Sequence, residues 1–330
     1  MKRITFLIIY LISTAATAQD IAVELSVQNP ILCSIEPIFY GLKIINNSAE
    51  VREIKIPWNL RRTPIIEFFD KKNNEWKELK NSNRTNYDRF PLVAGGGLTS
   101  DNYNKKIFIK PTQSIKQNFV YVPFDNNAYT SKNYYFKSGD TLNIRVAYLI
   151  DTESKDVVYS NEHTIVINDS IESEKNVIKY FKSLIIPHFI FEIAIFNPAY
   201  GGSPSPSTIK FMGVEQAKYI LENYPNSKYA AWADVHLAWN DYLAAEKNQL
   251  EAKYNLAQDS TQAVYEAKTL IIQAERHLES ALESKNTLVK PYAKQLYYSV
   301  VSMKMTLRLY ATLEEYLKAT EYIDSFSQKN

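Results

Sequence analysis

The stretch "ENYPNSKYAAWADVHLAWNDY", residues 222–242, decides the fold of the second half of the chain. Pro225 interrupts a helical pattern that begins at Gly213, because proline cannot continue a helix, and Ser227 is placed to cap the helix that follows. Beyond the break, small residues recur at helical spacing, which lets two helices approach closely. The sequence therefore predicts a helix-packing joint made of Pro225, Tyr229, Ala230, Ala233, Leu237 and Ala238.

This joint resembles the one between successive tetratricopeptide repeats in bacterial envelope proteins. The matching residues are Pro225, the pair Tyr229-Ala230 and the pair Leu237-Ala238, and a fainter match follows at "PYAKQL", residues 291–296. The two matches are not spaced as a regular repeat array requires. The resemblance implies an irregular helical-hairpin domain over residues 170–330, with later helices at 260–284, 287–309 and 311–327. Its Gly and Pro residues predict a loop at 197–208.

Before residue 170 the apolar residues alternate with period two. Clear examples run from Ile21 to Val27 and from Leu142 to Ile150. This period is typical of half-buried antiparallel strands. Further short runs end at turn residues: "IFYGLKII", "EIKI", "IIEFF", "KKIFI" and "NFVYV". Many short strands without intervening helices predict a β-sandwich over residues 19–169.

The phrases "EPIFYGLKIINNS", "GDTLNIRVAYL" and "YSNEHTIVIN" resemble the early strands and the last two strands of immunoglobulin-like domains in bacterial exported proteins. The inter-sheet cysteine pair of that family is absent, so the resemblance implies the architecture alone. The expected fold class is thus α+β with two domains. An immunoglobulin-like antiparallel β-sandwich precedes an all-α, tetratricopeptide-like domain.

Residues 1–18 are expected to be a secretory signal peptide. A basic start precedes an apolar run from Ile4 to Ile12, and small residues lead to a cleavage point after Ala18. The run is too short for a membrane span, which needs about 20 apolar residues. Gln19, rather than a cysteine, follows the cleavage point, so no lipid anchor is expected. These features predict an exported protein, periplasmic or extracellular, without a membrane span.

The overall composition excludes some partners and some modes of stabilisation. The 38 basic residues nearly balance the 36 acidic ones, so a nucleic-acid partner is not expected. One cysteine cannot form an internal disulfide, which leaves buried apolar surface to stabilise the fold. A chain of 330 residues with 45% hydrophobic residues is large enough for two domains.

No pattern in the sequence indicates catalytic, cofactor or metal chemistry. Asp234 and His236 are two positions apart on one helix and therefore point away from each other. The glycines at 95–97 lack the Lys-Ser/Thr of a phosphate loop, and Cys33 is expected to be a small buried apolar residue. None of the histidines has metal-ligand spacing: His163, His188, His236 and His277.

Exposed aromatic side chains are the candidate contacts to a partner. Tyr134, Tyr135, Tyr297 and Tyr298 occur in runs of adjacent aromatic residues, which cannot all face one core. Trp232 and Trp239, on one face of a predicted helix, are instead expected to pack between helices.

The leading hypothesis is an exported, non-enzymatic binding or scaffold protein that presents a helical surface to a protein or peptide in the bacterial envelope. In one alternative, the loops of the sandwich bind a glycan or inhibit a protease and the helices serve as support. In another, the protein is an enzyme whose site is scattered over both domains.

Overall fold

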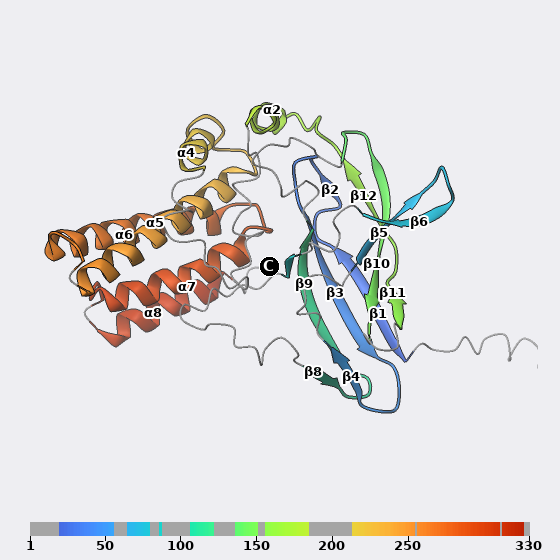
Figure 1. Cartoon of the computed structure of the whole chain (residues 1–330). Helices are drawn as coiled ribbons and strands as arrows, with labels where there is room; N and C mark the ends of the chain where they lie inside the picture. Colours follow the sequence, from blue (N-terminus) through green and yellow to red (C-terminus); the bar gives the residue numbers. More distant parts are fainter. Residues whose placement is uncertain are drawn as a thin grey trace, which may run out of the picture.

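The chain folds into an α+β structure in which strands come first and helices follow (Figure 1). The computed structural model describes residues 20–55, 65–79, 86–87, 106–121, 136–150, 156–184, 213–254, 256–310 and 312–326. The expected signal peptide, most of the apolar segment 184–196 and the loop 197–208 lie outside the described residues.

The strands form two larger sheets and a two-stranded ribbon. One sheet has the order β1-β3-β9-β7 and is antiparallel. The other has the order β2-β12-β10-β5-β6, with β11 also on β10, and is mixed because β2 runs parallel to β12. The ribbon pairs β4 with β8. The bounds are β1 Ile21–Val27, β2 Ile31–Leu32, β3 Ile38–Asn46, β4 Arg52–Lys55, β5 Ile65–Asp70, β6 Glu75–Glu78, β7 Asn86–Tyr87, β8 Lys106–Ile109, β9 Ser114–Tyr121, β10 Thr141–Leu149, β11 Val157–Tyr159 and β12 His163–Ile167.

The two larger sheets pack face to face, because side chains from both belong to one buried cluster. Strand β1 contributes Ile21, Val23 and Leu25, while β10 contributes Ile144 and Val146. These are the alternate positions that the period-two pattern assigns to a core.

Six helices are described in the second half: α2 Lys175–Ser183, α4 Val214–Asn223, α5 Ala230–Lys253, α6 Ser260–Glu283, α7 Lys290–Thr306 and α8 Leu313–Ser325. Local capping explains two of the starts. Asp259 accepts the backbone N–H groups of Thr261 and Gln262 at the start of α6. Thr312 and Glu315 form a capping box at the start of α8.

The break at Pro225 separates α4 from α5, but α5 begins at Ala230, later than Ser227 would place it. The expectation that Ser227 is the N-cap was therefore wrong. The reason is a turn in residues 225–229, within which the Ser227 hydroxyl accepts the N–H of Tyr229 and donates to Glu174.

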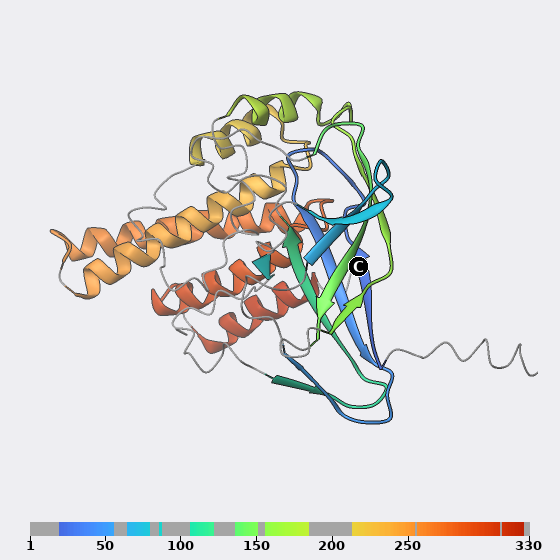
Figure 2. The same cartoon turned by 45° about the vertical axis from the view of Figure 1, so that its right-hand side comes forward.

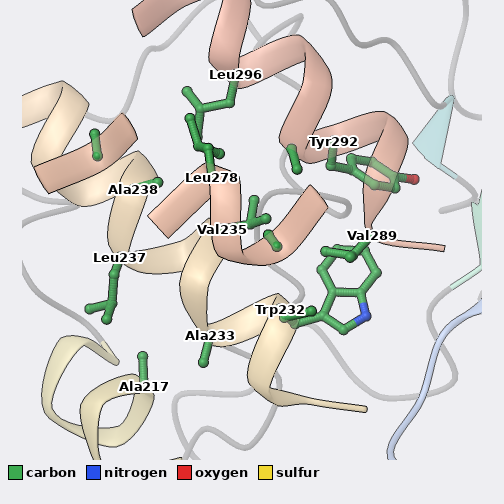
Figure 3. Packing of buried hydrophobic residues seen from close by; sticks show 14 of the residues in the cluster. Ala217, Trp232, Ala233, Val235, Leu237, Ala238, Leu278, Val289, Tyr292 and Leu296 are labelled. Atoms are coloured by element: carbon green, nitrogen blue, oxygen red, sulfur yellow. The ribbon is translucent and has the colours of Figure 1, made fainter. Parts of the chain in front are cut away.

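The first half of α5 is buried on every side, from Ala230 to Ala238. It packs against α4, α6 and α7 and against the sheets, so it needs no polar face. Figure 3 shows Ala217 of α4 and Ala233 of α5 turned toward the space between these two helices. Both are fully buried, which allows the close approach.

The helical core continues into the strands. Cys33, Ile35, Phe39 and Val120 belong to the buried cluster of the helices rather than to the cluster between the sheets. The views in Figures 1 and 2 agree in placing the ends of α5 and α7 beside the sheet of β3 and β9. The two halves of the structure are therefore joined by an apolar contact.

Candidate binding groove between the sheets and the helices

A groove of about 930 Å³ lies where the sheets meet the helices, and we call it the junction groove. Its walls come from the turn before β2, the turn between α4 and α5, and the connection between α6 and α7. Among its lining residues are Gln28, Glu36, Phe39, Glu174, Asn226, Lys228, Trp232, Asp234, Ser280, Glu283, Lys285, Asn286 and Thr287. Its volume is in the upper part of the range of about 300–1,000 Å³ typical of ligand pockets.

A cluster of aromatic rings lies at one side of the junction groove, and Phe39 and Trp232 of this cluster line it. The rings of Phe39 and Trp232 stack with centroids 5.6 Å apart, and Tyr292 lies 5.3 Å from Trp232. Figure 3 shows Trp232, Val289 and Tyr292 gathered at this point. Phe39 and Trp232 are 4% and 2% exposed, so they form a fixed base rather than a mobile lid.

An ion pair between Glu36 and Lys228 crosses from the strands to the helices, with 2.7 Å between Oε1 and Nζ. Glu36 also accepts the backbone N–H of Cys33 at 2.6 Å. Burial disfavours the charged ammonium, but attraction to Glu36 and neighbouring acidic groups outweighs it, so the pKa of Lys228 is raised. The pair thus fixes how the two halves face each other.

Glu174, just before α2, secures the turn between α4 and α5. Its carboxylate accepts the Ser227 hydroxyl at 2.5 Å and the backbone N–H of Lys228 at 3.1 Å. Asn286 donates to the carbonyl oxygen of Lys228 at 2.8 Å. Three separate segments therefore hold this wall of the groove in one conformation.

Asp234 joins α5 to α6 at the groove. His277 Nδ1 lies 2.8 Å from its Oδ1, and the Ser280 hydroxyl donates to its Oδ2 at 2.6 Å. A catalytic triad needs the serine hydroxyl to face the imidazole, which would take its proton. Here the serine donates to the carboxylate instead, so the three residues form a structural link and not an activated nucleophile.

Of the four tyrosines proposed as partner contacts, the structure describes Tyr297 and Tyr298. Tyr297 is only 3% exposed and donates to Glu279 at 3.0 Å, so the expectation of an exposed side chain was wrong for it. Its neighbour Tyr298 is partly exposed, because adjacent helical positions point in different directions. Tyr134 and Tyr135 lie outside the described residues. Neither Tyr297 nor Tyr298 lines the junction groove.

Most residues of the predicted joint are buried between helices: Tyr229, Ala230, Ala233, Leu237 and Ala238. Pro225 is exposed and lines the junction groove instead. Trp232 is buried, and Trp239 packs against the same cluster from a partly buried position.

The other residues that the sequence singled out have structural surroundings. Cys33 is fully buried, and burial raises the pKa of its thiol to about 11, which agrees with its expected role as a small apolar residue. His163 lies 2.7 Å from the carbonyl oxygen of Leu25, and His236 is buried within α5. His188 and the glycines at 95–97 are outside the described residues.

Within the part of the chain that the structure describes, no three His, Cys, Asp or Glu residues are placed to hold a metal ion. In the same part, no helix combines the length and the apolar character that crossing a membrane requires.

No family model matches the chain, and neither a curated protein nor a solved structure matches it significantly. The junction groove is therefore the feature of the molecule that bears on its function.

Sequence reasoning missed this groove, because its residues come from distant segments. Glu36 and Lys228, for example, are ordinary charged residues in sequence, and only the fold brings them together. The one local signal was the Pro225 break, which marks a turn where side chains and backbone groups become accessible.

Asp241 on α5 is expected to make stability depend on pH. Burial raises the pKa of its carboxyl group to about 6, and His277 and Lys218 oppose this rise only in part. Between about pH 4 and pH 6 the folded protein holds a proton that the unfolded chain releases, so stability falls as the pH rises through this window. We expect Asp241→Asn to raise the free energy of unfolding at neutral pH by about 1 to 2 kcal/mol.

Urea unfolding at both ends of this pH window measures the effect. The stability difference between the two pH values is expected to shrink in Asp241→Asn and to persist in Glu222→Gln, which changes an exposed carboxylate on α4. An Asp241→Asn variant no more stable than the parent at neutral pH would contradict the prediction.

Proposed function

We propose that this chain is an exported, non-enzymatic binding protein that holds an extended segment of a polypeptide partner in the junction groove. In this proposal an immunoglobulin-like sandwich and a tetratricopeptide-like helical domain together form the site. The observation that carries the proposal is a groove of about 930 Å³ built from both halves.

The construction of the groove is that of a preformed binding site. Its aromatic base is buried, and its wall is held by Glu36, Lys228 and Glu174. A rigid site loses little conformational entropy when it binds a ligand. The rim offers exposed polar side chains, namely Gln28, Asn226 and Thr287, which suit the N–H and C=O groups of an extended chain.

The titratable groups of the groove favour binding over catalysis. Glu36 is paired with Lys228, and Glu174 accepts hydrogen bonds from the turn before α5. Asp234 accepts one contact from His277 and one from Ser280. These groups fix the geometry of the walls, which is the role of supporting residues at a recognition site.

A variant that fills the groove tests the proposal. Thr287 is exposed on the rim, so Thr287→Trp adds a large ring without disturbing the core. We expect labelled short peptides from a random library to include binders, and Thr287→Trp to weaken their binding at least tenfold. Fluorescence anisotropy measures the affinities.

Thr269→Trp is the matched control, because Thr269 is an exposed residue of α6 that does not line the groove. Its affinity for the same peptides is expected to equal that of the parent. If no peptide binds, or if both tryptophan variants bind as the parent does, the proposed function is wrong.

A further inference from the structure

We propose that the junction groove selects a polypeptide segment carrying a basic side chain, lysine or arginine, which lies against Asp234 and Glu283. This inference rests on the proposed function and specifies the chemistry of the partner.

The charges that line the groove are unbalanced. Its acidic residues are Glu36, Glu174, Asp234 and Glu283, and its lysines are Lys228 and Lys285. The ammonium group of Lys228 is held by Glu36. Lys285 is the second lining lysine, and His277 contacts Asp234 from α6. Carboxylates therefore outnumber lysines in the lining, which gives the groove a negative charge that a cationic ligand would balance.

The end of α6 makes the same region more negative. Carbonyl groups at a helix C-terminus carry a partial negative charge, which basic residues in the last turn usually offset. The last turn of α6 has no basic residue and carries Glu283 at its final position. In the absence of a cation, a carboxylate at this position destabilises the helix. Such departures from local rules are expected at functional sites, and a bound cation would remove the penalty.

Asp234 provides a fixed carboxylate at the same place. Its side chain is 8% exposed, and each oxygen accepts one contact, from His277 or from Ser280. A carboxylate can accept about four hydrogen bonds, so capacity remains for a ligand donor. Ser280 is itself exposed and lines the groove, which places Asp234 at the boundary between core and solvent.

The chemistry of the region favours an organic cation over a metal ion. In the described part of the chain no three metal-ligating side chains converge, here or elsewhere. An extended segment that enters from the rim could place an ammonium or guanidinium group against the two carboxylates. The buried rings of Phe39 and Trp232 make the neighbouring wall apolar, which suits the aliphatic stem of a long basic side chain.

Paired charge variants of exposed residues test this inference. Glu283 and Lys285 are both exposed and lie close together in sequence, so neither substitution should disturb folding. For a groove-binding peptide with one lysine, we expect Glu283→Gln to weaken binding about two- to fivefold, as for an exposed ion pair. We expect Lys285→Gln to strengthen binding by a similar factor, and added salt to reduce both differences.

The same peptide with glutamine in place of lysine separates this inference from the proposed function. We expect the glutamine peptide to bind more weakly than the lysine peptide. Its affinity should be the same for the parent, for Glu283→Gln and for Lys285→Gln. If it binds equally well, or if a glutamate peptide binds better, the charge preference is refuted while groove binding stands. If no peptide binds, both proposals fail.

Discussion

Replacing Trp232 by alanine is expected to lower the free energy of unfolding by about 3 to 5 kcal/mol, the range for removal of a large buried aromatic side chain. Trp232 is 2% exposed, stacks on Phe39 of β3 and packs at a tilt against Tyr292 of α7. Its removal leaves a cavity where the strands meet the helices, and both neighbours lose a packing partner. The loss of stability should therefore affect the whole fold rather than α5 alone.

Denaturant unfolding followed by far-ultraviolet circular dichroism and by tyrosine fluorescence measures this effect. We expect both signals to move together to lower denaturant, because the strands and helices share the contact that Trp232 makes. Trp239→Ala is the matched control, since Trp239 lies on the same helix but is only partly buried, and a smaller loss is expected there. A loss below about 1 kcal/mol for Trp232→Ala would contradict the account.

The contact at Trp232 also affects how each half of the chain would behave if it were produced alone. Their different apolar periods suggest an all-β unit and an all-α unit, each with its own core. However, Ile35, Phe39 and Val120 are buried among helical residues. A strand half made alone would expose these side chains, which favours aggregation. Periodicity identifies the type of each element, but it does not show which element covers a given side chain.

Much of the fold could be predicted from local patterns. The alternation in β1 reflects one buried face and one more exposed face, and the Pro225 break separates α4 from α5. Strand β6 could not be predicted, because "EWKE" lacks alternating apolar residues. Its strand conformation comes from pairing with β5, in which Phe69 lies opposite Trp76.

The candidate site was largely hidden from sequence reasoning. Adjacent tyrosines suggested exposed contacts, yet Tyr297 is buried against α6 and bonded to Glu279. The groove instead depends on Glu36, Lys228 and Asp234, whose partners are distant in sequence. Pairing over such distances follows from the packing of whole elements, which a single sequence does not reveal.

Replacing Ala233 by leucine is expected to destabilise the protein by about 1 to 3 kcal/mol, because the added carbon atoms overpack a filled interface. Ala233 is fully buried and faces α4, where Ala217 is fully buried as well (Figure 3). Neither side of this contact has room for a larger side chain. To admit leucine, α4 and α5 would have to move apart.

Residues 225–228, in the turn between these helices, line the junction groove, so such a movement should also alter the binding site. We therefore expect Ala233→Leu to lower the melting temperature and to weaken peptide binding together. Ala244→Leu is the matched control, since Ala244 lies on the same helix but is only partly buried, and both quantities should stay close to those of the parent. If Ala233→Leu weakened binding without lowering the melting temperature, Ala233 would be a contact surface. Such a result would refute the helix-packing role, because a fully buried side chain cannot touch a partner unless the helices around it have already separated.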